Sequence, residues 1–510
     1  MTVCRQRVFY RWVRRARGQR WATVRGSSAA VGAALLSAGG EPPSAARIET
    51  ARIAGRSGWQ QQAVSRVAAL ATVFLLMWPC VARPEASPVE AIRVADDAAL
   101  RAALRGARPE QTILIAPGRY QPGLYVDHLE GRPDAPITIS GENPSKPPLF
   151  EGGTEAWHLS RCKHLVLRHL TIRGQSGNGI NIDDGGQRTE PAGPIVLEDI
   201  HVSRIGPEGN RDGIKLSGVA DFTIRRCTIE GWGGQAIDMV GCRRGLIEEC
   251  LFRGLKGFSQ ATGPQTKGGT SEVVIRGCWM IDAGQRAVNI GGSTGMAYFR
   301  PPEAKYEAKH ITVEVCTFVG SMAPIAFVGV DGAVVRYNTI VRPSRWIMRI
   351  LQETTAEGFP PCRDGVFQRN LIVYDGREVR EAVNIGPNTA PESFRYRENL
   401  WFRIDRPEAS RPQLPSVEVD GRYGIDPRLP DLVEFGPAAD PASDVSAGEG
   451  PPTDAAVQTA TKRAVKTLVP REPRAADYGA AAWPAANTGR QDRHPTGAAA
   501  PASKSALSGR

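Results

Sequence analysis

The stretch "QTKGGTSEVVIRGCWMIDAGQRAVNIGG" (265–292) consists of short apolar runs separated by glycines. Its segment "IRGCWM" (275–280) is one of nine copies of a six-residue pattern: an apolar residue, two variable residues, a special position, any residue and an apolar residue. The special positions are Leu170, Ile200, Cys227, Cys250, Cys278, Cys316, Asn338, Asn370 and Asn399. Because each coil of a parallel β-helix contributes three short strands and tolerates loops of any length at its corners, this unevenly spaced repeat predicts a parallel β-helix.

A second, four-residue pattern follows most copies of the first: a small residue, Ile or Val, a variable residue and an apolar residue. It occurs as "GINI" (179–182), "GIKL" (213–216), "AIDM" (236–239), "AVNI" (287–290), "PIAF" (324–327) and "AVNI" (382–385). Alternation with a period of two predicts a strand with its apolar residues inward and its variable residue outward. The fold class predicted is all-β, a single-stranded parallel β-helix.

Helix signals are sparse, and the strongest is "DDAALRAALRGA" (96–107), with an Asp cap and apolar residues three to four apart. We expect this segment to form an N-terminal α-helical cap that shields the open end of the coil stack, where unpaired strand edges would invite aggregation.

Four cysteines occupy the special position in successive coils, and Cys162, Cys242 and Cys362 form a second row. Side chains in one row point the same way, so we expect buried thiols that behave as small apolar groups. Parallel Cβ vectors disfavour disulfides, and collinear ligands disfavour zinc. The three asparagines that continue the first row predict an inward ladder in which each amide bonds the next coil.

The ends of the chain differ in composition from its middle. Residues 1–83 hold 13 Arg, no Lys and two acids, Glu41 and Glu49, whereas the rest has equal numbers of basic and acidic residues. The excess positive charge therefore does not indicate a nucleic-acid partner.

The leader, residues 1–86, includes an uncharged apolar run at 67–80 preceded by Arg66 and followed by small residues, the layout of an export signal. The run is too short to span a bilayer comfortably. We expect an exported chain, periplasmic, cell-surface or secreted, with a β-helix over 92–430. The Ala/Pro-rich extension 431–510 is expected to be largely disordered.

The outward positions of the second pattern form a candidate binding face. They are Asn181, Lys215, Asp238, Asn289, Ala326 and Asn384, with Thr266 or Lys267 from 263–269 and Arg349 from "RWIMRIL" (345–351) filling the missing coils. A neighbouring row holds Asp212, Gln235, Arg286 and Glu381, and a long loop carries Arg300. A linear strip with more cations than anions suits an extended anionic polymer such as a uronate polysaccharide, because guanidinium groups grip carboxylates bidentately. Most of these residues would be solvated on any sheet surface, so their function stays open.

Two carboxylate pairs offer alternatives for hydrolysis. Asp212 and Asp238, on adjacent coils, resemble a glycosidase pair. Asp183 and Asp184 are adjacent in sequence, so their side chains point to opposite faces or into the loop. His201 and His310 lie within predicted strands and are expected to be structural.

The opening segments "EQTILIAPGRY" (110–120) and "GRPDAPITISGENPSKPPLFEGG" (131–153), followed by the coil repeats, resemble the pectin-lyase-like right-handed parallel β-helix superfamily. They are similar to chondroitinase B and the related alginate lyases, over about 92–430. The resemblance implies a Lys base, an assisting Arg on the next coil, and acidic calcium ligands shortly before the Lys. Lys267 and Arg286 correspond to the Lys and the Arg, but Arg286 falls slightly early and "SQATGPQ" (259–265) has no acid. Calcium is therefore implied by the resemblance without its expected ligands, and no other cofactor is indicated.

Three functions remain open from the sequence. The first is a polysaccharide lyase in which Lys267 and Arg286 are catalytic and Lys215, Asp238, Asn289, Arg300 and Arg349 bind substrate. The second is a non-catalytic carbohydrate-binding or structural β-helix protein. The third is a glycoside hydrolase that uses Asp212 and Asp238. Fold alone does not choose among them, because function resides in sites grafted on folds.

Overall fold

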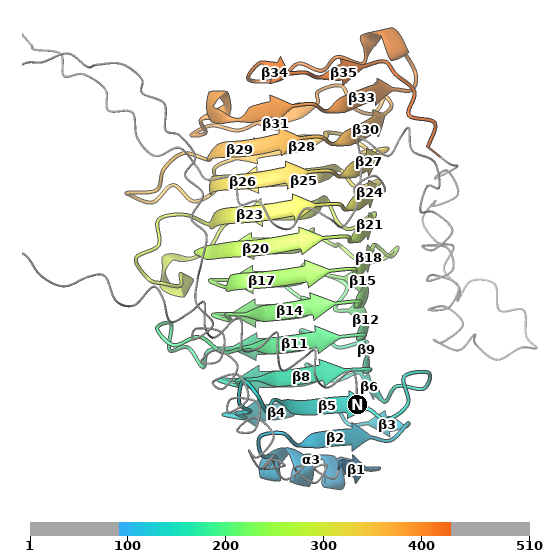
Figure 1. Ribbon diagram of the computed structural model, residues 1–510, viewed down its shortest axis with the longest axis vertical. Helices are drawn as coiled ribbons and strands as arrows, with labels where there is room; N and C mark the ends of the chain where they lie inside the picture. The colour runs from blue at the N-terminus through green and yellow to red at the C-terminus, as the bar shows by residue number, and fades with distance from the viewer. Residues whose placement is uncertain (1–90, 430–510) are drawn as a thin grey trace, which may run out of the picture. The chain divides into compact units, whose positions relative to one another are not determined.

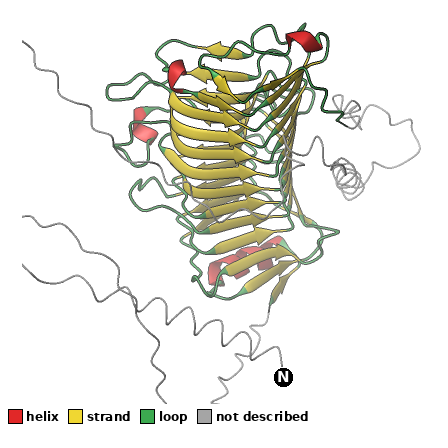
Figure 2. Ribbon diagram, turned by 45° about the horizontal axis from the view of Figure 1, so that its top comes forward, coloured by secondary structure: helices red, strands yellow, loops and turns green. Residues whose placement is uncertain are grey.

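The structure is a computed structural model that describes residues 91–429. The predicted export signal at 67–80 and the predicted disordered extension 431–510 lie outside the described residues. Strands within the described range form three stacked parallel sheets, which we name A, B and C (Figures 1 and 2). Each coil supplies one strand to sheet A, then to B, then to C, as β14, β15 and β16 do. The predicted parallel β-helix is therefore confirmed.

Sheet A, within residues 91–429, consists of β1 (Ile92–Val94), β2 (Thr112–Ile115), β5 (Ile137–Gly141), β8 (Leu165–Arg168), β11 (Ile195–Glu198), β14 (Phe222–Arg225), β17 (Arg243–Glu248), β20 (Thr270–Arg276), β23 (Ala308–Glu314), β26 (Val330–Arg336), β29 (Arg363–Gln368), β32 (Arg395–Arg397) and β34 (Glu418–Val419). Sheet B consists of β3 (Arg119–Tyr120), β6 (Leu149–Glu151), β9 (Thr171–Arg173), β12 (His201–Ile205), β15 (Thr228–Trp232), β18 (Leu251–Arg253), β21 (Trp279–Ile281), β24 (Thr317–Val319), β27 (Thr339–Val341), β30 (Leu371–Tyr374), β33 (Leu400–Arg403) and β35 (Arg422–Tyr423). Sheet C consists of β4 (Leu124–Asp127), β7 (Trp157–Ser160), β10 (Ile180–Asp183), β13 (Ile214–Ser217), β16 (Gln235–Val240), β19 (Thr262–Lys267), β22 (Arg286–Gly291), β25 (Ala323–Val328), β28 (Met348–Leu351) and β31 (Val383–Ile385).

The six-residue pattern turns out to be a corner and not a single strand. In "IRRCTI" (224–229), Ile224 and Arg225 are the last residues of β14 in sheet A, a two-residue turn follows, and Thr228 begins β15 in sheet B. The turn residue before the special position has positive φ, as in Arg226 (φ 52) and Tyr337 (φ 57), which sharpens the bend. One pattern thus contains parts of two strands, which is why three sheets produce two sequence patterns.

The special positions stack inside this corner and link successive coils. The side-chain amide of Asn338 donates to Asn370 Oδ1 at 3.0 Å, and that of Asn370 donates to Asn399 Oδ1 at 3.0 Å. Asn399 in turn donates to Glu418 Oε1 at 2.7 Å, so a carboxylate ends the ladder. All three asparagines are fully buried, and the predicted ladder is confirmed.

The seven cysteines within residues 91–429 are free, buried thiols, as the row argument predicts. Burial raises the pKa of Cys162 and Cys242 to about 12 and that of Cys362 to about 11. The thiol of each is therefore the neutral form at neutral pH, and it packs as a small apolar side chain.

Helix α3 (Asp97–Gly106) occupies the expected segment, and Asp96 accepts a hydrogen bond from the Ala99 amide at 2.8 Å. Its buried residues Leu100, Ala103 and Leu104 lie on one side, and the helix contacts β1, β2 and β4 at the N-terminal end of the stack (Figure 1). Three short 3₁₀ helices, η2 (Met296–Tyr298), η3 (Pro391–Ser393) and η4 (Pro407–Ala409), lie in loops. No helix among the described residues is both long and apolar enough to cross a membrane.

We predict that Asn370→Ala lowers the free energy of unfolding by about 2–4 kcal/mol, because Asn338 loses the acceptor of both its backbone and side-chain N–H groups. Urea unfolding measures the change. Asn210→Ala, at an exposed loop position, is the matched control and should change stability by less than about 0.5 kcal/mol. Equal effects of the two substitutions would contradict the ladder's role.

We also predict that the seven buried thiols do not react with a thiol-specific reagent in the folded protein at pH 8. Cys4 and Cys80 lie outside the described residues, so the measurement uses a chain with Cys4→Ser and Cys80→Ser. Seven thiols should react rapidly in denaturant and none in its absence. Rapid reaction of any thiol in the folded chain would show that the row is open to solvent.

Candidate functional site

The outward residues of sheet C form one continuous row along the stack. Lys215 pairs with Asp238, Asp238 with Gln265, and Gln265 with Asn289 across successive strands. The full row is Tyr125, His158, Asn181, Lys215, Asp238, Gln265, Asn289, Ala326, Arg349 and Asn384. Residues on either side of the members, such as Ile214 and Leu216, are buried in the coil interior, except for Ile385 beside Asn384, which is exposed. The alignment predicted from the sequence is therefore correct at seven of these positions.

The coil at 263–269 was assigned incorrectly. Gln265 occupies the row, whereas Thr266 pairs with Ile290 and is buried, and Lys267 pairs with Val240. Gly263, Pro264, Gln265 and Thr266 follow the second pattern, but Pro and Thr stand where apolar strand residues normally recur. Lys267 lies two residues beyond the row at the end of β19, and alternation keeps it on the same face.

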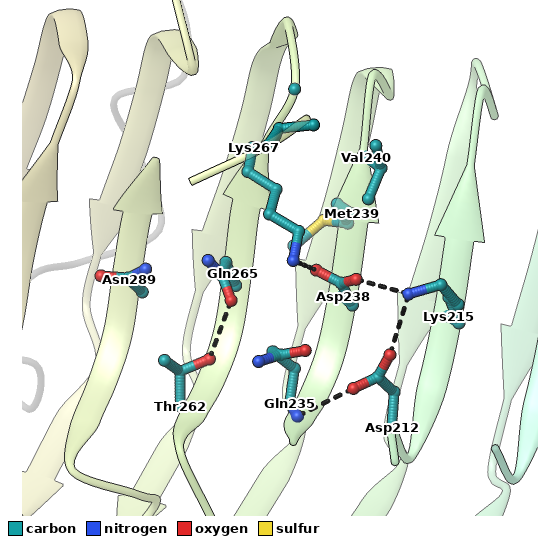
Figure 3. A network of polar contacts seen from close by, with 12 residues as sticks. Asp212, Lys215, Gln235, Asp238, Met239, Val240, Thr262, Gln265, Lys267 and Asn289 are labelled. Atoms are coloured by element: carbon teal, nitrogen blue, oxygen red, sulfur yellow. Dashed lines mark hydrogen bonds and ion pairs between the residues drawn. The ribbon is translucent and has the colours of Figure 1, made fainter. Parts of the chain in front are cut away.

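Four charged side chains form a network, which we name the Asp–Lys quartet: Lys215, Asp238 and Lys267 on β13, β16 and β19, and Asp212 just before β13 (Figure 3). Lys215 Nζ lies 3.0 Å from Asp212 Oδ2 and 2.7 Å from Asp238 Oδ2. Lys267 Nζ lies 3.1 Å from Asp238 Oδ1, and this ionic contact is the only partner of that oxygen among the described residues. The two lysines thus neutralise the two carboxylates.

Burial sets the electrostatics of the quartet. Both aspartate side chains have no exposed surface, whereas those of Lys215 and Lys267 are 22% and 14% exposed. Burial and then the negative charge of Asp238 raise the pKa of Asp212 above its usual value. Burial alone would lower the pKa of Lys215, but the two carboxylates outweigh it and raise that pKa. Lys215 therefore remains an ammonium ion that holds the carboxylates in place, and it is unsuited to act as a base.

A second group of charges lies on the later coils, and we name it the arginine cluster: Arg286, Arg345 and Arg349, with Trp346 and Glu353. The guanidinium carbons of Arg345 and Arg349 lie 4.1 and 4.6 Å from the centre of the Trp346 ring. Arg286 donates to Glu353 Oε1 at 2.8 Å.

The arginine cluster carries more positive than negative charge. Burial and the positive charge of Arg286 lower the pKa of Arg349, with a smaller contribution from Arg345. Arg349 Nε donates to the neutral Asn384 Oδ1 at 2.9 Å. Glu353 is the one acid whose charge offsets the three cations in these contacts. The cluster can therefore attract an anionic group.

Lys267 and Arg286 do not meet, although they lie on neighbouring coils as expected. Arg286 pairs with Thr262, at the opposite end of β19 from Lys267. Thr262, the partner of Arg286, lies five residue steps from Lys267 along the strand, or roughly 16 Å at 3.3 Å per residue. The error follows from placing Lys267 in the row, which Gln265 occupies.

Two other predicted binding residues are engaged within the protein. Arg300 forms a bidentate pair with Asp184, at 2.6 and 2.9 Å, and so fastens its loop to the strand end after β10. Asn289 is 1% exposed and donates to the Gly291 carbonyl at 3.1 Å. Asp183 contacts His158 at 2.7 Å, so Asp183 and Asp184 do diverge and form no pair.

Glu307 could not be selected from any pattern in the sequence. It is fully buried, and its carboxylate accepts hydrogen bonds from the Gly268 amide at 2.7 Å and from Thr294 and Thr354. It thereby fixes the turn that follows Lys267. Trp346 was also missed, although its position between two arginines in "SRWIMR" (344–349) was a readable signal.

The residues around Lys267 do not fit a calcium site. The described residues contain no group of three or more His, Cys, Asp or Glu side chains placed to hold a metal. The carboxylate in contact with Lys267, that of Asp238, and the neighbouring carboxylate of Asp212 are already paired with ammonium groups. The donor set thus lacks the charged oxygen ligands that calcium prefers.

Comparison with known proteins bears on the fold. Residues 156–344 match the family model described as "Right handed beta helix region". No curated protein matches the chain. Among solved structures, an alginate lyase from Paenibacillus sp. str. FPU-7 is similar at 17% identity, covering 59% of this chain and 99% of that one, with a TM-score of 0.39.

Two further structures show the same range of similarity. A PL6 family polysaccharide lyase from Pseudopedobacter saltans has 12% identity over 71% of this chain and 97% of its own, with a TM-score of 0.42. A GH136 lacto-N-biosidase from Eubacterium ramulus has 12% identity over 71% and 72%, with a TM-score of 0.38. At these identities and TM-scores the three structures carry no argument about activity. The chain folds as a right-handed parallel β-helix.

Proposed function

We propose that this chain binds an acidic polysaccharide, such as a uronate polymer, along the outward face of sheet C. The observation that carries the proposal is the arginine cluster, in which Arg345 and Arg349 stack on Trp346 while the one acid, Glu353, pairs with Arg286. Guanidinium groups without an acidic partner gain free energy when a carboxylate binds, because the charge-assisted hydrogen bonds are strong and bidentate.

The length of the polar face supports a polymer over a small ligand. Lys215 on β13 and Arg349 on β28 are five coils apart, or roughly 24 Å at 4.8 Å per coil. Between them the row is polar except for Ala326. The four members between them are less than a tenth exposed, so a ligand that contacts both Lys215 and Arg349 has to span this distance, which corresponds to several sugar units.

We further propose that the bound polymer is cleaved by β-elimination, with Lys267 as the base. In its neutral amine form, Lys267 would take the proton at C5 of the uronate. The C5–H electron pair forms the C4–C5 double bond, the C4–O bond breaks, and the leaving oxygen takes a proton from water. Arg286 binds the polymer at a distance from this step, which revises its expected role beside the base.

Export of the chain is part of the same proposal. Its support is the apolar run at 67–80, which Arg66 precedes, the layout of an export signal. Export would also bring the chain to polysaccharides that lie outside the cytoplasm. The alternatives are a non-catalytic carbohydrate-binding protein and, with less support, a hydrolase. The distances from Lys215 leave Asp212 and Asp238 within about 6 Å of each other, a spacing near that of glycosidase pairs, but both carboxylates are fully buried.

We predict that Arg349→Ala weakens binding of a uronate polymer about 10–100-fold, because it removes one charge-assisted contact. Isothermal titration against polyuronates and a neutral glucan measures the change. Arg276→Ala, which removes an arginine from the outward face of sheet A, is the matched control and should bind normally. The proposed binding face would be ruled out if the wild type bound the neutral glucan as tightly as the polyuronates. It would also be ruled out if Arg349→Ala bound the polyuronates as tightly as the wild type.

We predict that Lys267→Ala abolishes cleavage and retains binding within about threefold, since the amine is the base and the anion-binding residues are untouched. Ultraviolet absorbance of the unsaturated product across a panel of uronate polymers measures cleavage. The matched control is Lys309→Ala, on the outward face of sheet A.

The outcomes of this assay separate the three functions. Undiminished absorbance in Lys267→Ala contradicts the base assignment. Binding by the wild type with no product from any polymer indicates a non-catalytic protein. New reducing ends without unsaturation, lost in Asp238→Asn, indicate a hydrolase.

A further inference from the structure

The outward face of sheet B changes character halfway along the stack. In the N-terminal half one outward row is polar, with Ser203, Glu230 and Arg253 in register. From β21 onward the same row is aliphatic, and its members are Ile281, Val319, Val341 and Val373. Residues between them, such as Phe318 and Ile340, fill the coil interior, so the aliphatic row points away from the core.

This aliphatic row is shielded although it lies outside the coil. Each of its four members is less than a tenth exposed. The parallel outward row contains Leu371 and Leu400, which are 1% and 5% exposed. An outward sheet face in contact with water would leave such side chains open and would favour aggregation.

The last described residue of the chain already lies on this face. Leu371, Val373 and Leu400 form an apolar cluster separate from the main core, and Phe402 and Leu429 pack against it. The chain therefore enters the face at β30 and β33, at the point where the described part ends.

The sequence after Leu429 has the composition and length to continue along the row. It reads "PDLVEF" (430–435), with Leu432, Val433 and Phe435, before the Ala/Pro-rich stretch begins. Three coil steps separate β30 from β21, or roughly 14 Å, which an extended chain covers in about five residues. Because this segment is tethered at Leu429, it meets the row at high effective concentration and outcompetes a second molecule.

We propose that residues 430–435 dock on the outward face of sheet B and cover the aliphatic row from β30 to β21. The occupant is thus a segment of the same chain, and its side chains Leu432, Val433 and Phe435 supply the apolar contact. Docking covers the aliphatic part of sheet B. The proposal does not depend on the polysaccharide-binding function.

The first test replaces two of the docking side chains in the full chain, as Leu432→Asp with Phe435→Asp. The matched control is Val465→Asp with Leu468→Asp, which has the same spacing farther along the extension. We expect the docking variant to lower Tm by about 2–8 °C and to increase the fluorescence of an apolar-surface dye, whereas the control changes neither. Equal behaviour of the two variants overturns the proposal.

The second test reads proximity directly through a disulfide and does not depend on a change in stability. The full chain with Ile281→Cys and Phe435→Cys is oxidised, and its peptides are analysed by mass spectrometry. The control is the chain with Ile281→Cys and Val469→Cys, oxidised in the same way. We expect the yield of the 281–435 disulfide to be at least about tenfold higher than the yield of the 281–469 disulfide in the control.

Two results would assign a different occupant and overturn the proposal. In the first, dye binding increases when residues 1–86 are deleted but does not increase in the docking variant. This result would indicate that the leader covers the aliphatic row. The other is a wild-type dimer in gel filtration whose 281–435 disulfide forms only between molecules, which indicates a second copy.

Discussion

The register between successive coils is the constraint on which the rest of this structure depends. Main-chain pairing holds neighbouring strands about 4.8 Å apart, and the buried ladder of Asn338, Asn370 and Asn399 ties the coils together where sheet A turns into sheet B. Because the turn tolerates one inward side chain per coil, a slip by one residue would bury a charged side chain and expose an apolar one. Residues more than twenty positions apart, such as Lys215 and Asp238, become neighbours only through this register.

The same stacking creates an electrostatic problem that the face of sheet C solves locally. Outward carboxylates on adjacent coils would repel one another, and burial would make their charges costlier still. Lys215 between Asp212 and Asp238 reduces that cost in the middle coils, and His158 beside Asp183 does so nearer the N-terminus. Hydrogen bonding to Asp183 is the first cause that raises the pKa of His158, which favours the cationic form. On the later coils Glu353 pairs with Arg286, and the positive charge of Arg345 and Arg349 remains available to a ligand.

Much of this arrangement could be predicted from periodicity, and what could not has physical reasons. The rows of Cys, Asn and outward polar residues follow from alternation and repeat alignment alone. Gln265 was misplaced because Pro264 and Thr266 stand where apolar strand residues mark the register elsewhere. The partner of Arg300, Asp184, lies 116 positions away, and no local pattern encodes a contact between a loop and a distant turn. The aliphatic row of sheet B was hidden because "TFV" (317–319) and "TIV" (339–341) look like strands buried on both sides, with no sign of which side faces the core.

The contrast between sheets B and C bears on how a solenoid acquires a single binding face. Both sheets have the same strand spacing and both present outward rows, so geometry alone gives a polymer no reason to prefer one. On the later coils of sheet B the outward side chains are aliphatic, which suits contact with another apolar segment and offers no hydrogen bonds to a sugar. On the same coils of sheet C they include Arg349 and Asn384, which offer donors and acceptors at the spacing of the coils. The choice of one residue per coil in each row therefore decides which face a hydrated, charged polymer can use.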